Sequence, residues 1–525
     1  PVPKRLPPRG LGLLGARDPV VGALLALGPR PRRDAVEMVL ALRPGLWWSD
    51  PRTGTRCLTE LARARRPDTA FALVLALRSS GCELNVIHFN AGAAACAKAG
   101  KWEMVLQLMA LMAEDSVDKD TITYNSAISA CEKAAAWQVA LELLAEMGGA
   151  GAAPDAISVN AALSACEKGG SWRAALALFA AVADLGVQAD EITYSAAISA
   201  CEKCGRWQEA LRLFSGMAGQ NIELSTIACN AAISACARGE EWQRALELFA
   251  TMPREGVERS SVTYGAALSA CEKGGQWRLA VELLAHAPEL NAIICTSAIS
   301  ACEKGRRWQV ALHILSSMRD ATVHVDTVAC SSVISACEKG EQWQRALALF
   351  AGMPEERLPR DAVCFNSAIS ACATGGQWQL AVVLLDAMRP ERARPDEVSY
   401  GSAVASCRKA GEWRVVLQLL AAMKSAGIAA STIACNAAIS SCKAGGEWQV
   451  ALELFELMAQ ERAERDAITY SAFLGVYSAA GEWRLALQLL GAMVKDPAAS
   501  SSTVHKAAKS YLGSRVLRGR GANLV

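Results

Sequence analysis

The chain has 525 residues, of which 52% are hydrophobic and 20% charged, and its formal net charge is +2. This apolar content excludes a globally disordered chain, and the length predicts either two to four domains or one repetitive structure. Nineteen cysteines are too few for a disulfide scaffold, and their odd number favours a reducing compartment.

Basic residues are concentrated at both ends of the chain. Residues 1–70 carry a net charge of +7 and residues 502–525 carry +5, which leaves −10 for the part between them. Residues 1–50 are predicted to form a basic leader with some helices. Its first seventeen residues contain four cations and no acid, which is compatible with the remnant of an organellar transit peptide. A leader without a targeting role, or a fragment, explains the same pattern equally well.

Tryptophan marks a tandem repeat along most of the chain. Twelve of the fourteen tryptophans are spaced 35 residues apart, with one interval of 31, and they stand at 102, 137, 172, 207, 242, 277, 308, 343, 378, 413, 448 and 483. If each unit begins sixteen residues before its tryptophan, residues 86–501 hold twelve units. They are 86–120, 121–155, 156–190, 191–225, 226–260, 261–291, 292–326, 327–361, 362–396, 397–431, 432–466 and 467–501. Residues 51–85 are predicted to be a degenerate earlier unit, and residues 502–525 a basic tail or a truncated capping hairpin.

Each unit is predicted to form two amphipathic helices with a short break between them. In unit 121–155 the helices are expected at about 124–133 and 137–147, because apolar residues recur there at helical spacing. Neither helix can bury its apolar stripe alone, so neighbouring units are expected to stack around a continuous core that includes the tryptophans. The predicted fold is therefore all-α, a right-handed α-solenoid superhelix of tandem 35-residue helix–turn–helix repeats.

The residue types that carry chemistry give no sign of catalysis. Eleven cysteines occupy one slot on the inner face of the first helix, where cysteine behaves as a small hydrophobic residue. Cys201 and Cys204 have CxxC spacing, but a single such pair inside a helix is weak evidence for zinc. The five histidines are scattered, and no phosphate-binding loop or convincing membrane span is present. We therefore predict no catalytic residue, no metal, no cofactor and no membrane association.

The repeat resembles the pentatricopeptide repeat family. Residues 121–133 read T-I-T-Y-N-S-A-I-S-A-C-E-K, and they are followed by Trp137, the A-L-E-L-L run at 140–144 and the closing Asp155. The resemblance covers residues 86–501 well and residues 51–85 weakly. The tetratricopeptide repeat is similar, but its period is 34 and its tryptophan lies early in the first helix. The resemblance implies a protein, expected to be a monomer, that binds single-stranded RNA with one base per repeat.

The resemblance also implies that the fifth residue and the last residue of each unit select the base. These pairs are Asn90/Asp120, Asn125/Asp155, Asn160/Asp190, Ser195/Ser225, Asn230/Ser260, Gly265/Asn291, Thr296/Asp326, Ser331/Asp361, Asn366/Asp396, Gly401/Ser431, Asn436/Asp466 and Ser471/Ser501. In the family's pairing rules Asn with Asp favours U, Thr with Asp favours G and Asn with Ser favours C. With the N-terminus toward the 5′ end, the implied footprint begins U-U-U and has U again at the ninth and eleventh units.

Two further sets of residues recur once per unit. The second residue is always a β-branched aliphatic, which the resemblance places against the base, whereas packing between units is the alternative. These residues are Ile87, Ile122, Ile157, Ile192, Ile227, Val262, Ile293, Val328, Val363, Val398, Ile433 and Ile468. A cation near the end of the first helix is suited either to contact phosphate or to complement the helix dipole. These cations are Lys98, Lys133, Lys168, Lys203, Arg238, Lys273, Lys304, Lys339 and Lys409.

The resemblance therefore implies a sequence-selective RNA-binding protein of a plastid (chloroplast) or mitochondrion. Such a protein acts in RNA processing, stabilisation, editing or translation by occupying RNA and recruiting RNA-processing proteins. Because the array is acidic, base contacts rather than bulk charge are expected to carry specificity. Two alternatives stay open: a protein-interaction scaffold, which the acidic charge favours, and the binding part of an enzyme whose catalytic domain is absent.

Overall fold

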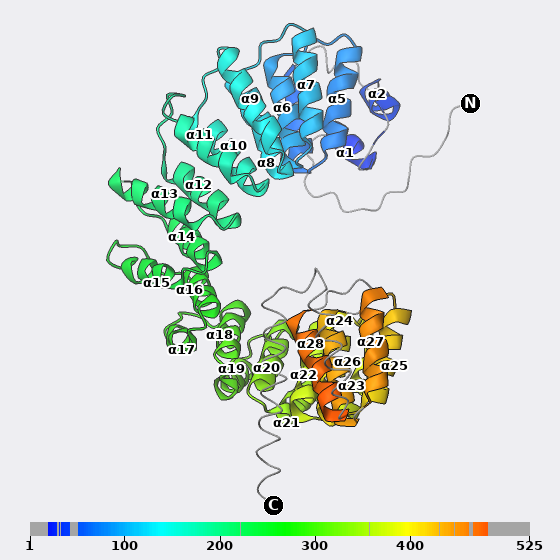
Figure 1. The fold of residues 1–525 in the computed structure, drawn as a ribbon. Coiled ribbons are helices and arrows are strands. Elements are labelled where there is room, and N and C mark those ends of the chain that lie inside the picture. The colour runs from blue at the N-terminus through cyan, green and yellow to red at the C-terminus, as the bar shows by residue number, and fades with distance from the viewer. Residues whose placement is uncertain are drawn as a thin grey trace, which may run out of the picture. The chain divides into compact units, whose positions relative to one another are not determined.

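A computed structural model describes residues 19–28, 31, 33–41, 51–220, 222–355, 357–429, 431–445, 447–460 and 466–480. Every regular element within these ranges is an α-helix, as predicted (Figure 1). None of the described helices is long and apolar enough to cross a membrane. Most of the leader apart from residues 19–28 and 33–41, the second helix expected in unit 467–501, Ser501 and the basic tail lie outside the described residues.

The chain forms two compact units, residues 1–270 and 271–525, and each is described by itself. The first unit contains α1 (Pro19–Ala26), α2 (Arg33–Ala41), α4 (Pro51–Arg63), α5 (Pro67–Ser79), α6 (Val86–Lys98), α7 (Trp102–Glu114), α8 (Thr121–Ala134), α9 (Trp137–Gly149), α10 (Ala156–Lys168), α11 (Trp172–Ala181), α12 (Glu191–Lys203), α13 (Trp207–Gly219), α14 (Thr226–Arg238) and α15 (Trp242–Thr251). The boundary between the units falls within α16 (Ser261–Lys273).

The second unit continues the same alternation of helices. It contains α17 (Trp277–Ala285), α18 (Ala292–Lys304), α19 (Trp308–Asp320), α20 (Thr327–Lys339), α21 (Trp343–Gly352), α22 (Ala362–Gly375), α23 (Trp378–Met388), α24 (Glu397–Ala410), α25 (Trp413–Ser425), α26 (Thr432–Gly445), α27 (Trp448–Gln460) and α28 (Ala467–Ala480). From α7 on, each second helix that the structure describes begins at the tryptophan of its repeat.

Local chemistry sets where the first helix of each repeat begins and ends. The expected start of α8 at about 124 is three residues too late, because the side chain of Asp120 accepts a hydrogen bond from the backbone N–H of Thr123 and caps the helix. The turn to the second helix needs a left-handed residue two positions before the tryptophan. Gly170 takes this conformation with φ of +68°, and Glu341 takes it with φ of +59°.

First helices stack on one another along each unit. In the first unit α8 packs on α10 and α10 on α12, and in the second unit α18 packs on α20 and α20 on α22. Away from α16, each described second helix packs against the first helices on either side of it, as α9 does with α8 and α10. All eleven cysteines of the repeated slot are buried at these contacts, which confirms that prediction. Burial raises the pKa of the Cys131 thiol to about 11, so this thiol stays protonated and packs as an apolar group.

The eleven tryptophans of the array within the described ranges are half-buried, and they lie at the edge of the core. Trp137 packs against the edge of the core. Its ring faces Gly169 of the next repeat so closely that an added Cβ there would lie 2.4 Å from Cδ1. Arginine covers several of the rings, and the guanidinium carbon of Arg345 lies 4.3 Å from the ring centre of Trp308. These tryptophans therefore fill the joint between consecutive repeats.

Candidate nucleic-acid interface

Five of the predicted base-selecting pairs form the same contact near the N-terminal ends of the first helices. The fifth residue lies in the second turn of its own helix, and the closing residue directly precedes the next first helix, which stacks beside it. Nδ2 of Asn90 donates to both carboxylate oxygens of Asp120, at 3.0 and 3.1 Å. Asn125 and Asn366 make the same two bonds, to Asp155 and Asp396, and Asn160 and Asn436 each donate to one carboxylate oxygen, of Asp190 and Asp466, all at 3.0 to 3.3 Å.

The pairs that close with serine are arranged less uniformly. The hydroxyl oxygens of Ser195 and Ser225 are 3.4 Å apart, so this pair also comes together. The hydroxyl of Ser260 lies 3.1 Å from that of Thr263, in the helix that Ser260 caps, rather than against Asn230. The partner of Ser471 is Ser501, which lies outside the described residues. The hydroxyl of Ser471 donates to the carbonyl of Ile468 in its own helix.

The closing residue has a second role, which the sequence reasoning missed. Asp155 accepts a hydrogen bond of 2.8 Å from the backbone N–H of Ser158, and it thereby caps α10. Every described closing residue from Asp120 to Asp466 accepts the equivalent bond. Capping favours Asp, Asn or Ser at this position whatever the protein binds. The Asp-x-x-Thr and Asp-x-x-Ser patterns are related to a capping box and could have revealed this role.

Besides Ser260, four closing residues make this capping bond without a hydrogen bond to their predicted partners among the described residues. Gly265 and Gly401 have no side chain that could bond to the closing residue. The hydroxyl of Ser331 donates to the carbonyl of Val328 in its own helix at 2.9 Å, and the hydroxyl of Thr296 is buried without a partner among the described residues. The four closing residues, with capping bonds of 2.7 to 3.3 Å, are Asn291, Asp326, Asp361 and Ser431.

The physical reason for this difference lies at the fifth position. Asparagine has an amide donor long enough to reach the closing carboxylate across the joint between repeats, as Asn90 reaches Asp120. Glycine has no donor, and a serine or threonine hydroxyl near the start of a helix can bond within its own helix instead. In these four units the closing residue is therefore placed chiefly by the helix that it caps.

Hydrogen bonds keep several closing carboxylates charged. Burial by itself would raise the pKa of Asp190, but hydrogen bonds from Thr193 and Asn160 outweigh burial and hold the pKa below the usual value for aspartate. The same balance lowers the pKa of Asp120, Asp396 and Asp466. At neutral pH these groups are therefore ionised acceptors facing an amide donor.

The twelve aliphatic residues at the second position are all exposed. Their exposed fractions range from 56% for Val328 to 77% for Ile433. Within the described part of the chain they are twelve of the sixteen large hydrophobic side chains that are exposed. Packing between units would have buried them, so that alternative does not explain their position. Each lies three residues before the fifth position, at the same end of the first helix.

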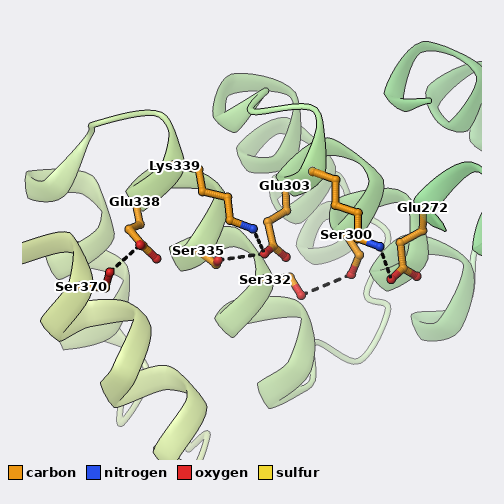
Figure 2. A network of polar contacts seen from close by, with 9 residues as sticks. Glu272, Ser300, Glu303, Ser332, Ser335, Glu338, Lys339 and Ser370 are labelled. Atoms are coloured by element: carbon orange, nitrogen blue, oxygen red, sulfur yellow. Dashed lines mark hydrogen bonds and ion pairs between the residues drawn. The ribbon is translucent and has the colours of Figure 1, made fainter. Parts of the chain in front are cut away.

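The predicted phosphate-contacting cations are largely engaged with the preceding repeat. Nζ of Lys339 lies 2.7 Å from a carboxylate oxygen of Glu303 (Figure 2). Nζ of Lys304 lies 3.8 Å from a carboxylate oxygen of Glu272. The same pairing joins Lys168 to Glu132, Lys203 to Glu167 and Arg238 to Glu202. Lys133 and Lys409 donate to backbone carbonyls of Ala97 and Thr374. These cations therefore join consecutive repeats, and the carboxylates partly neutralise the five that they pair with.

Serine hydroxyls extend this polar network along the first helices of the second unit. Ser335 donates to Glu303 at 2.8 Å, and Ser370 donates to Glu338 at 2.5 Å (Figure 2). Burial raises the pKa of Glu338, although Ser370 and Lys339 oppose the shift. No three His, Cys, Asp or Glu side chains gather closely enough within the described ranges to hold a metal ion. Cys201 and Cys204 are free thiols.

Comparisons with known proteins agree with this geometry. The pattern described as pentatricopeptide repeat-containing protein matches residues 55–182, and the pentatricopeptide repeat domain matches residues 212–273 and 418–496. The single PPR repeat matches residues 192–222, 328–358, 363–389 and 398–428. Together these matches cover more than half of the chain, and the chain belongs to the pentatricopeptide repeat family. No curated protein matches the sequence significantly.

Solved structures show the same fold. The crystal structure of the pentatricopeptide repeat protein PPR10 from maize is 19% identical, covers 96% of this chain and 88% of its own, and has a TM-score of 0.55. PPR10 in complex with an 18-nucleotide psaJ RNA element is 17% identical, covers 96% and 89% of the two chains, and has a TM-score of 0.42. The likeness of fold rests on the first of these two structures.

Proposed function

We propose that this protein binds single-stranded RNA in a sequence-selective way, with one base per repeat. The observation that carries the proposal is the exposed aliphatic residue at the second position of every repeat, beside a polar pair that includes a hydrogen-bonded Asn and Asp in five of them. Membership of the pentatricopeptide repeat family supports the proposal, and PPR10, a pentatricopeptide repeat protein, has been solved in complex with an RNA element.

The aliphatic residues suit contact with a flat apolar surface. A soluble protein rarely exposes large apolar side chains in a regular series without a binding role. Valine and isoleucine have few side-chain conformations, so little entropy is lost when a base packs against them. Their spacing of one per repeat supplies one such contact for each base, and the neighbouring polar pair can then distinguish the base edges.

The Asn/Asp pairs suit recognition of a base that presents an acceptor. An asparagine amide has two N–H donors, and one of these is directed at the closing carboxylate. The second N–H of Asn90 is left for a base carbonyl, as uracil offers. The five Asn/Asp repeats are therefore proposed to select U, and the other pairs of the implied footprint follow the family's rules.

Charge has a secondary part in this proposal. Five of the nine proposed phosphate-contacting cations are paired with glutamates, so they attract phosphate more weakly than free cations. Binding by base contacts should then depend less steeply on salt than the number of cations suggests. In the cell the protein is proposed to act in a plastid or mitochondrion. There it would affect RNA processing, stability, editing or translation by occupying the strand and recruiting RNA-processing proteins, without a catalytic step of its own.

Selection from a random RNA pool with the full chain tests the proposal. The expected result is an enriched motif with U at its first, second, third, ninth and eleventh positions. Replacing Asn125→Ala together with Asn160→Ala should weaken binding of that motif about 30-fold, as expected for two lost hydrogen bonds, and relax only the second and third positions. The matched control is Ser215→Ala with Ser316→Ala, on exposed faces of second helices, which should leave binding unchanged.

Two results would refute this function. One is a pool that yields no enriched motif, and the other is a motif whose second and third positions are unaffected by the asparagine substitutions. Either result would favour the protein-interaction scaffold, for which the acidic charge of the repeats is the supporting observation.

A further inference from the structure

Fifth-position asparagines also meet a side chain from the third residue of the following repeat. Oγ1 of Thr123 donates to Oδ1 of Asn90 at 2.6 Å. Thr193 makes the same bond to Asn160 at 2.7 Å. Ser399 makes it to Asn366 at 2.5 Å. The same hydroxyls lie 2.7 to 2.9 Å from the closing carboxylate, so two acceptors share their single proton. In these three repeats the amide therefore has a partner on both sides, the closing carboxylate at its nitrogen and a hydroxyl at its oxygen.

In the sequence, Asn at the fifth position of one repeat also goes with a hydroxyl at the third position of the next. Six repeats have Asn at the fifth position, and all six are followed by a hydroxyl at the third position of the next repeat. These hydroxyl residues are Thr123, Ser158, Thr193, Thr263, Ser399 and Thr469. The five repeats in 191–431 with Ser, Thr or Gly at the fifth position are each followed by a residue without a hydroxyl. Those residues are Ala228, Ile294, Ala329, Cys364 and Ala434.

Copying of whole repeats does not explain this association. If whole repeats had been copied, Asn at the fifth position would go with a hydroxyl at the third position of the same repeat. In four of the six Asn repeats it does not: the third residue is His88, Ala228, Cys364 or Ala434. Only units 121–155 and 156–190 combine Asn with a hydroxyl in the same repeat. The hydroxyl therefore accompanies the asparagine that it touches across the joint between repeats, 33 residues earlier in the chain.

The side-chain oxygens of the remaining three asparagines lack such a donor. The carbonyl oxygens of Asn125, Asn230 and Asn436 are buried and have no hydrogen-bond partner among the described residues. The hydroxyls that follow them are hydrogen-bonded to the closing residue and not to the asparagine: Ser158 to the carbonyl of Asp155, Thr263 to Ser260, and Thr469 to Asp466. A buried acceptor without a partner is costly, and the hydroxyl of the adjoining cap is a donor that can satisfy it.

We propose that the third residue of the following repeat is a positioning residue for base selection, and that it forms a three-residue readout with the fifth and closing residues. The inference rests on the function proposed above and deepens it. The two ends of an amide have nearly the same shape, so only their partners fix which end faces the base. With the hydroxyl on Oδ1 and the carboxylate on Nδ2, the atom left for the base is a donor N–H. Without the hydroxyl the amide turns more easily, presents its carbonyl, and discriminates less.

Replacing Thr193→Val tests this role, because valine keeps the shape of threonine and removes the hydroxyl. The full chain is titrated with the motif selected above and with variants that carry each of the four bases at the third position. The preference for U at the third position should fall about fivefold, which is the value of one neutral hydrogen bond. The preference at the ninth position, read by Asn366, should not change. The conservative variant Thr193→Ser should retain the preference for U.

Thermal unfolding of the same variants separates positioning from a structural role. Thr193 also accepts a hydrogen bond of 3.3 Å from the backbone N–H of Asp190, so the valine variant is expected to lose some stability. If it binds all four RNAs more weakly by one common factor, its preference for U is intact and the positioning role is wrong. A wild-type chain with no preferred base at the third position would refute both this inference and the proposed function. A wild-type preference that survives Thr193→Val would refute the inference alone.

Discussion

The close joint between repeats predicts that Gly340 cannot be replaced by alanine without cost. Gly340 directly follows α20 with φ of −88°, which any residue can adopt, so the backbone does not require glycine. The constraint comes from the ring of Trp308 in the preceding repeat. A Cβ at position 340 would lie 2.3 Å from Cδ1, 3.0 Å from Cγ and 3.2 Å from Nε1 of that ring. These separations are well below normal carbon contact, so either the ring or the joint has to move.

Two opposing effects set the size of the change. Alanine restricts the unfolded chain and by itself stabilises a protein by about 0.4–1 kcal/mol at a compatible position. Overpacking a well-filled site costs about 1–3 kcal/mol. We therefore expect Gly340→Ala to lower the free energy of unfolding by about 1–2 kcal/mol. Ala134 occupies the same slot one repeat after Trp102, so a Cβ is accommodated in that repeat, and a larger loss is not expected.

Gly352 supplies the matched control for this substitution. It ends α21, and a Cβ there would have no heavy atom within 4 Å. Gly352→Ala should therefore be neutral or stabilise the chain by up to about 1 kcal/mol. Urea unfolding followed by tryptophan fluorescence measures both variants. If the urea midpoints of the two variants coincide, the packing of Trp308 on Gly340 does not limit that position and the reasoning is wrong.

Four further predictions follow from single features of the repeats. Ile157→Ala should weaken RNA binding severalfold but change the free energy of unfolding by less than about 0.5 kcal/mol, because the side chain is 63% exposed; a loss of stability without loss of affinity would contradict its proposed contact with a base. Glu341→Gly should stabilise the chain by about 1 kcal/mol in urea unfolding, because φ is +59° there, and an unchanged midpoint would show no strain. Glu303→Gln should release Lys339 and steepen the logarithmic salt dependence of RNA binding by up to about 0.7, whereas an identical slope would exclude a phosphate role for this lysine. The pKa of Asp190 is held below its ordinary value of about 3.9, so the stabilising contribution of this carboxylate should be complete above about pH 4 and be lost as the pH falls through the lowered pKa. Urea midpoints measured at several pH values should therefore decline less for Asp190→Asn than for wild type.

The sequence by itself determined the repeat, the helical class and much of the core. A period of 35 with helical spacing of apolar residues leaves few other ways to bury those residues, so helices beginning at Trp137 and its equivalents could be predicted from local pattern alone. The eleven buried cysteines were predicted for the same reason, since residues of one slot in a regular array share one environment. The pairing of Asn with the closing Asp was implied by the family resemblance, not by spacing.

The tertiary structure decided the roles that depend on contacts between repeats. Three features depend on how one repeat stacks on the next. They are the exposure of Ile157 and its equivalents, the ion pair of Lys339 with Glu303, and the packing of Trp308 on Gly340. The bond from Thr193 to Asn160, which lie 33 positions apart in the chain, depends on this stacking as well. Helical periodicity gives the face on which a side chain lies, but the stacking of one repeat on the next decides what that face meets.

The closing residues illustrate this limit. The same slot holds Asp190, which caps a helix and also holds the amide of Asn160, and Asp326, which caps a helix without a hydrogen bond to Thr296. Local sequence places both residues at a helix start, because a side-chain acceptor is favoured there. Only the stacked helices decide whether the residue across the joint also reaches the carboxylate.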